Sequence, residues 1–183
     1  MDHPELVHLV NTDPVARTLL AAAIPMRIAY VGLDGHPRSV PVAYLWNGEA
    51  FVFASPPTAY KVKAIAAHPE VAFTVDTASD DARARVAAEL GPPVGDYTPL
   101  IMLGRGRASV QIRDGLPQEH VDASRRMVPA AEMAEWERAK RAATSAMAVI
   151  SVAPTHLTLC DFITRFPPPH AVGPAAYQTS PAR

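Results

Sequence analysis

The stretch "GHPRSVPVAYLWNGEAFVFASPP", residues 35–57, decides how the chain is expected to fold. Two apolar runs flank Asn47-Gly48, a pair that is typical of a type I′ hairpin turn. Pro41 interrupts the first run. Because proline cannot donate a ladder hydrogen bond, it belongs at a sheet edge, at a bulge, or beside something other than a strand. We therefore predict a β-hairpin of residues 37–46 and 49–55, with an unusual neighbour next to Pro41.

The sequence on either side extends this hairpin into a mainly β domain with helices, an α+β fold. Further strands are expected at 26–32, 70–76, 99–112, 146–154 and 155–163, and helices at 4–11, 14–23, 58–68, 79–91, 118–127 and 130–143. Thr58 is the expected N-cap of the 58–68 helix, and the glycines of 99–112 predict a bend in that strand. Six to seven antiparallel strands at this spacing indicate a closed or partly closed barrel with helices packed outside.

Length and composition favour one domain of ordinary size, residues 1–183, with a proline-rich tail at 168–183. The net charge of −1 gives no basic surface for nucleic acid. The apolar runs are too short to span a bilayer, and the first residues do not resemble a signal peptide. With a single cysteine and no such signal, a cytoplasmic location is expected. The helix at 79–91 is either a lid or a decoration far from any site.

Metal and nucleophile chemistry have little support in the sequence. The seven histidines form no H-x-x-x-H or H-E-x-x-H pair, so no metal site is predicted. Cys160 lies in an apolar strand, where a thiol is usually packed and inert. Gly104-Arg105-Gly106 lacks the third glycine of a dinucleotide fingerprint and opens no helix. No catalytic residue is assigned.

The three lysines of this arginine-rich chain are Lys61, Lys63 and Lys140, and the first two fall at the start of the 58–68 helix. Free N–H groups and a lysine at a helix N-terminus suit a phosphate, and Ser55 and Thr58 would add hydroxyls. The alternative is that both lysines are merely solvated. The residues alone leave both interpretations open.

The order of these features resembles the pyridoxamine 5′-phosphate oxidase-like flavoproteins, the FMN-binding split barrels. The resemblance consists of an Asp-Gly turn, a strand with an internal V-P-V, a hairpin, and the run S-P-x-x-x-x-K-x-K-x-I-x-x-x-P at 55–69. It continues more loosely through "LGRGRASV" and "AVISVAPTHLTLCDFITRFP", and covers about residues 14–167. It implies an FMN-binding split β-barrel core over that range.

The resemblance also implies a homodimer with cofactor sites at the subunit interface. The strand at Val40 to Tyr44 would run beside the flavin ring, Ala54 and Ser55 would face the cofactor, and Lys61 would bind its phosphate. With Thr58 and Lys63 from the helix-start argument, the predicted cofactor-binding residues are Val40, Pro41, Val42, Ala43, Tyr44, Ala54, Ser55, Thr58, Lys61 and Lys63. The cofactor itself would then be the unusual neighbour of Pro41.

Two departures from the oxidase pattern argue against vitamin B6 oxidation. The oxidases carry an R-x-H-x-R clamp for their substrate, and the matching positions here are Thr158, Cys160 and Phe162. Tyr60 stands where the oxidases place an arginine before the phosphate-binding lysine. We therefore expect pyridoxine 5′-phosphate to be a poor substrate.

The sequence thus favours an FMN-dependent oxidoreductase acting on an unidentified small molecule, with the deazaflavin coenzyme F420 as the alternative cofactor. The alanine- and arginine-rich composition is typical of GC-rich bacteria, many of which make F420. Arg27, Arg105 and Arg107 are candidates to meet the anionic glutamate tail of F420. The alternative function is a non-catalytic flavin or haem/tetrapyrrole binding protein.

Overall fold

A computed structural model describes residues 2–77, 84, 88 and 100–161 of the chain. In that part, seven strands form one antiparallel sheet in the order β2-β1-β5-β6-β7-β4-β3. The strands are β1 (Met26–Val31), β2 (Pro37–Val42), β3 (Leu45–Trp46), β4 (Phe51–Ser55), β5 (Glu70–Asp76), β6 (Leu100–Asp114) and β7 (Ala146–Asp161). The helices that lie wholly within the described residues are α1 (His3–Thr12), α2 (Pro14–Ala21), α3 (Tyr60–Ala67), α5 (Gln118–Ser124) and α6 (Met133–Ala143).

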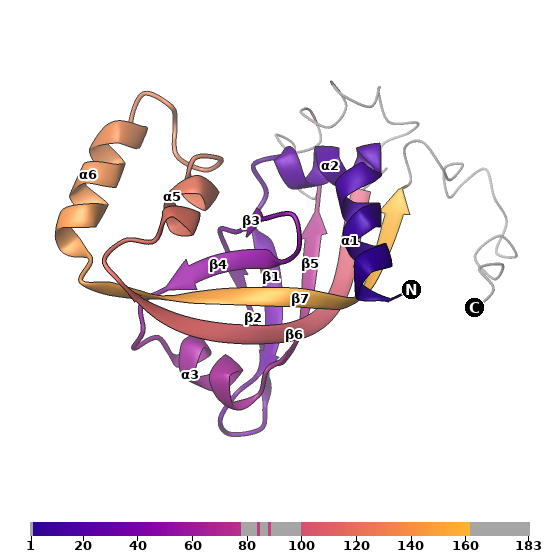
Figure 1. Ribbon diagram of the computed structural model, residues 1–183, viewed down its shortest axis with the longest axis horizontal. Helices are drawn as coiled ribbons and strands as arrows, with labels where there is room; N and C mark the ends of the chain where they lie inside the picture. The colour runs from indigo at the N-terminus through magenta and orange to yellow at the C-terminus, as the bar shows by residue number, and fades with distance from the viewer. Residues whose placement is uncertain (1, 78–83, 85–87, 89–99, 162–183) are drawn as a thin grey trace, which may run out of the picture.

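The long β6–β7 hairpin organises the molecule (Figure 1). It pairs from Leu100 opposite Asp161 to Asp114 opposite Ala146, and α5 and α6 are inserted at its far end. A register shift between Arg105 and Gly106 produces the bend that the glycines predict. The sheet does not close, because β2 and β3 are its two edges. This open arrangement is a split barrel, as expected from the sequence.

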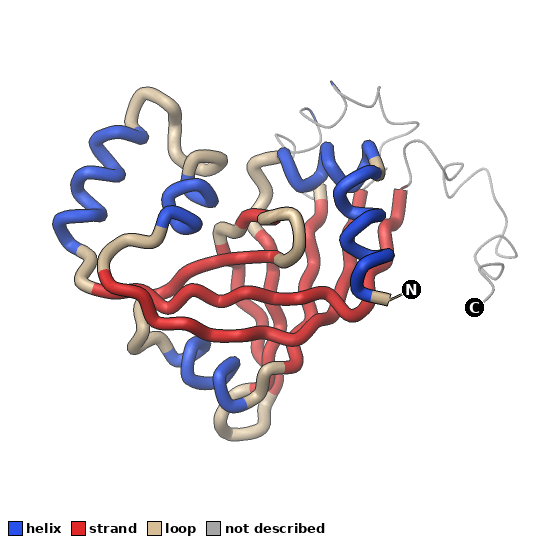
Figure 2. Tube along the Cα trace, in the orientation of Figure 1, coloured by secondary structure: helices blue, strands red, loops and turns tan. Residues whose placement is uncertain are grey.

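The core lies where the sheet curves around its aromatic side chains. Tyr44, Phe51 and Phe53 are completely buried, and the Phe51 ring contacts Tyr44, Trp46 and Phe73 at centroid distances of 4.5–5.9 Å. Each such side chain stabilises the fold by about 1.5–3 kcal/mol through burial. In Figure 2, α1 and α2 lie together on the upper side of the sheet and α3 lies below it. None of the described helices is long and apolar enough to cross a membrane.

The prediction of one continuous strand over residues 37–46 is wrong. It breaks at Ala43 and Tyr44, so that β2 pairs with β1 while β3 pairs with β4, at opposite edges of the sheet. The Tyr44 side chain is completely buried, and its carbonyl accepts a hydrogen bond from Arg126. Because this contact holds the backbone at Tyr44 away from the β1–β2 ladder, the chain crosses to the other edge.

The type I′ turn at Asn47-Gly48 is also wrong, since that turn needs a positive φ at both central residues. Gly48 has φ +100°, but no described non-glycine residue has a positive φ. The Asn47 side-chain oxygen instead accepts from the backbone N–H groups of Glu49 and Ala50. This side-chain hydrogen bonding stabilises a longer loop.

Pro41 occupies an edge strand, as the sequence requires. It lies opposite Arg27 of β1, and β2 has no second partner among the described strands. Its missing N–H therefore costs no ladder hydrogen bond on the outer side.

Two other expected boundaries differ in the structure. The strands expected at 146–154 and 155–163 are one strand, β7, because Pro154 lies at the register shift opposite Gly106, where a missing N–H is tolerated. Apart from residues 84 and 88, the expected 79–91 helix lies outside the described residues, as does the 168–183 tail.

Candidate functional site

A cavity of about 650 Å³ opens at the start of α3, a volume in the usual range for small-molecule sites. One wall comes from the end of β2, the end of β4 and the turn that follows β4. The rest of the lining comes from Leu116, α5, α6, and the residues just before and at the start of β7. The lining residues are Pro41, Val42, Ala43, Ala54, Ser55, Pro56, Pro57, Thr58, Lys61, Leu116, His120, Lys140, Ala143, Thr144, Ser145, Ala146 and Met147.

The cavity brings together seven of the ten residues that the sequence proposes for cofactor binding: Pro41, Val42, Ala43, Ala54, Ser55, Thr58 and Lys61. The other three lie elsewhere. Tyr44 is in the core, Val40 packs against the core, and Lys63 is exposed on α3. The sequence therefore predicts most of one wall of the cavity.

Ser55 is the most informative residue of this wall. Its side chain is only 2% exposed, yet its hydroxyl oxygen has no hydrogen-bond partner in the structure. A buried polar group left unsatisfied costs about 1–3 kcal/mol. A ligand oxygen reaching the cavity would supply the missing partner.

The start of α3 differs from the expected one. The N-cap is Ala59, with no side-chain capping hydrogen bond, and Thr58 is not the cap. The reason is the turn after β4, in which the Ala59 N–H donates to the Pro56 carbonyl and delays the helix. Lys61 is thus the second residue of an uncapped helix, where N–H groups and the helix dipole favour an anion.

Tyr60 fixes the position of this helix start. Its hydroxyl accepts a hydrogen bond of 2.9 Å from the Leu33 N–H, and the Arg38 guanidinium lies 4.8 Å from its ring centroid. Asp34 in turn pairs with Arg38, which holds the pKa of the Asp34 carboxyl well below its usual range. Tyr60 therefore joins the β1–β2 turn to the start of α3, one residue before Lys61.

The cavity lining also includes two residues that sequence reasoning did not assign, His120 and Lys140. The His120 ring is half-buried and tilted against Trp136, with centroids 5.8 Å apart. Its Nδ1 atom is buried without a partner. Burial, followed by the positive charge of Lys140, lowers the pKa of His120 below its usual value. His120 is therefore a neutral hydrogen-bonding group at neutral pH.

In the part of the chain that the structure describes, the charges that line the cavity have one sign. They are Lys61 and Lys140, and no described aspartate or glutamate lines it. Among the described residues, neither lysine forms an ion pair with a carboxylate. The arrangement suits anionic ligands.

The other candidates do not contribute to this cavity. Arg27 pairs with Asp76 and Arg107 with Glu70, and neither these arginines nor the exposed Arg105 line it. Burial raises the pKa of the Cys160 thiol, as expected of an inert cysteine. Thr158 and Cys160 lie on β7 away from the cavity, and Phe162 lies outside the described residues. No metal-binding cluster occurs among the residues that the structure describes.

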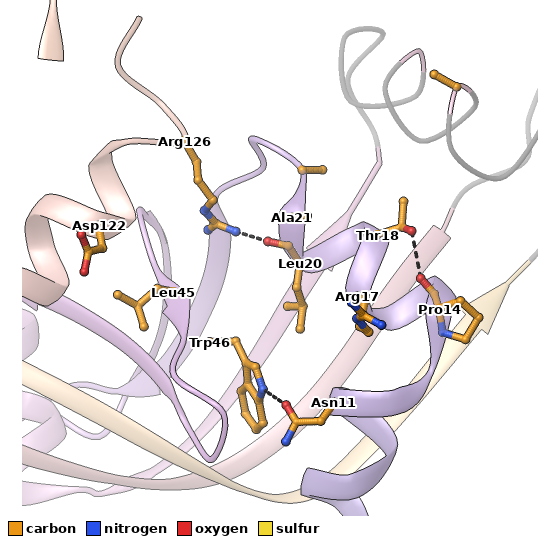
Figure 3. Close-up of a pocket in the computed structure, with 12 residues that line it drawn as sticks. Asn11, Pro14, Arg17, Thr18, Leu20, Ala21, Leu45, Trp46, Asp122 and Arg126 are labelled. Carbon is orange, nitrogen blue, oxygen red and sulfur yellow. Dashed lines mark hydrogen bonds between the residues drawn. The ribbon is translucent and has the colours of Figure 1, made fainter. Parts of the chain in front are cut away.

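A second cavity of about 950 Å³ lies between α1–α2, β3 and α5 (Figure 3). Arg126 reaches across it to the Leu20 carbonyl, and the Trp46 indole donates to Asn11. None of the ten predicted residues lines this cavity. The two hydrogen bonds of Arg126 and Trp46 join the end of α5 to α2 and β3 to α1.

The open seven-stranded sheet, with a cavity between the β2 edge, the start of α3 and the β6–β7 insertion, defines a split-barrel protein. Residues 12–161 match the family model described as pyridoxamine 5′-phosphate oxidase. The chain therefore belongs to this family, as the sequence resemblance indicates.

Solved structures support the fold. An F420 reductase aligns with a TM-score of 0.50 and 22% identity, over 78% of this chain and 94% of that one. A conserved hypothetical protein from Mycobacterium tuberculosis aligns with a TM-score of 0.51 and 13% identity, over 88% and 86%. A protein from Agrobacterium tumefaciens gives a TM-score of 0.51 and 13% identity, over 87% of this chain and 58% of that one. No curated protein matches the sequence significantly.

Proposed function

We propose that the protein is a homodimeric flavin-dependent oxidoreductase that acts on a small molecule other than a vitamin B6 phosphate. One observation carries the proposal. The same cavity collects Lys61 at an uncapped helix start and the buried, unpartnered hydroxyl of Ser55. A phosphate bound there would satisfy both groups.

The lining residues fit a flavin with a phosphate side chain. Lys61, Ser55 and Thr58 would hold the phosphate, and the strip of Pro41, Val42 and Ala43 would lie along the ring. The cofactor, when bound, supplies the hydride or electron chemistry. The chain's own residues then bind the phosphate, orient the ring and exclude water from the cavity.

FMN is our first choice of cofactor and F420 is the alternative. Both combine a ring with a phosphate, so Lys61 would bind either one. Structural likeness to an F420 reductase is a reason to test F420 directly. The three arginines considered for the F420 tail do not line the cavity, which favours FMN or a different contact for that tail.

The proposal is tested by identifying the small molecule that the purified protein releases on denaturation, using mass spectrometry. We expect FMN or F420, and we expect the loaded protein to exchange electrons with NAD(P)H or with reduced F420. A coloured protein that reacts with neither would favour the non-catalytic flavin or haem binder. Efficient conversion of pyridoxine 5′-phosphate would contradict the exclusion of vitamin B6 oxidation.

A further inference from the structure

A second group of lining residues, separate from Lys61 in the sequence, has the features of a polar subsite. It combines the cationic Lys140 and half-buried His120 with the hydroxyl residues Thr144 and Ser145. Two parts of the chain contribute these residues: α5 carries His120, and the end of α6 with the turn that follows it carries the other three. The fold therefore brings α5 and the end of α6 together at this place.

Charge pairing distinguishes Lys140 from its neighbours on α6. Arg138 pairs with Glu135, and Arg141 pairs with Glu137. Lys140 has no such partner among the described residues, and it is close enough to His120 for its charge to act on that ring. An ammonium and a neutral imidazole, in a cavity whose described lining contains no acidic residue, are suited to an anion.

We propose that Lys140 and His120 form a second anion subsite, which binds a carboxylate in the same cavity as the Lys61 phosphate subsite. A carboxylate fits better than a second phosphate, because Lys140 lies in the last turn of α6 and lacks the free helix-start N–H groups that accompany Lys61. Lys140 supplies that charge, and the neutral His120 ring can donate one N–H to a carboxylate oxygen.

The inference rests on the proposed function, because it assumes that a cofactor phosphate takes the Lys61 end. The carboxylate then has two sources, the substrate or the glutamate tail of F420. Either source would explain why the cavity lining holds an unpaired lysine from α6 in addition to Lys61 from α3.

The test uses para-fluorobenzoate and its neutral analogue para-fluorobenzamide as probes, with binding followed by fluorine NMR on the FMN-loaded protein and on the protein without cofactor. Lys140→Gln removes the proposed charge. Arg138→Gln removes one positive charge from the same helix outside the cavity and is the matched control. We expect Lys140→Gln to weaken benzoate binding about ten-fold, to leave benzamide binding unchanged, and the control to behave as wild type.

A parallel titration with FMN and F420 separates the two sources. If F420 affinity falls in Lys140→Gln while FMN affinity is retained, the carboxylate is the cofactor tail; if only benzoate binding falls, it is the substrate. If Lys140→Gln and Arg138→Gln bind benzoate with the same affinity, and also bind F420 with the same affinity, the proposal is overturned. Wild-type protein that binds neither cofactor, but binds benzoate in a Lys140-dependent way, would refute the flavin function and leave the subsite standing.

Discussion

Ser55 and Lys61 show how single residues define the proposed phosphate end of the cavity. They are six positions apart in the sequence, at the end of β4 and the start of α3, so one short stretch carries both. This proximity is why the sequence predicts that end. His120 and Lys140 come from an insertion far along the chain, and their approach to Lys61 depends on the path of β6 and β7. The only signal in the sequence was that Lys140 is the third lysine of an arginine-rich chain.

Replacing Ser55 with alanine should separate binding from stability. Without cofactor, Ser55→Ala should keep or slightly raise the free energy of unfolding, because the lost hydroxyl has no partner in the fold. Affinity for FMN should fall several-fold. Denaturant unfolding and an FMN titration measure both, with Ser39→Ala on the exposed part of β2 as control. A clear loss of stability at unchanged affinity would mean that the hydroxyl is structural.

His120 should make stability depend on pH. Its pKa is lowered in the folded protein, so the unfolded chain binds a proton more readily. Its contribution is therefore fully present above the ordinary histidine pKa of about 6.5 and is lost as pH falls from there toward the folded pKa. The charged group that acts on it is Lys140, from α6.

The matching measurement compares wild type with His120→Asn in denaturant unfolding across mildly acidic to neutral pH. Wild type should lose more stability than the variant as pH falls. Parallel pH profiles would show that burial of the imidazole does not disfavour its protonation.

For helices and strands, the residue range of a strand was easier to predict than the strand with which it pairs. β5 begins and ends where the alternating pattern predicts. The break between β2 and β3 could not be predicted, because it depends on Arg126, more than eighty residues from Tyr44 along the chain. The start of α3 was misplaced because the turn closed by the Pro56 carbonyl overrides the capping preference of Thr58.

The bend of β6 should be sensitive to substitution at Gly106. A Cβ at this position would lie 2.3 Å from the Ala153 carbonyl oxygen, which belongs to the backbone of β7 and cannot easily move. Gly106→Ala should therefore destabilise the protein by about 1–3 kcal/mol. Urea unfolding measures this, with Ser109→Ala on the exposed face of β6 as control. Equal stabilities would mean that the β6–β7 hairpin adjusts freely at the bulge.

For the whole molecule, the order of strands and helices in the sequence was sufficient to identify the split barrel. Its assembly is a prediction. Leu103 and Ile112 of β6 are 41% and 55% exposed, and Leu33 in the β1–β2 turn is 52% exposed. Together with the family resemblance, these apolar side chains lead us to expect a homodimer. Sedimentation should give twice the chain mass, and a stable monomer with full cofactor occupancy would contradict this.

The most direct test of a cofactor phosphate bound by Lys61 is a titration with FMN and with F420. It compares cofactor-free wild type, Lys61→Ala and Lys63→Ala. Both lysines lie on α3, but only Lys61 lines the cavity. A hydrogen bond to a charged group contributes roughly 1.5–3 kcal/mol, so Lys61→Ala should weaken binding about ten- to a hundred-fold. Lys63→Ala should bind nearly as wild type does. Equal affinities of wild type and Lys61→Ala for both cofactors would contradict the placement of the phosphate at the start of α3.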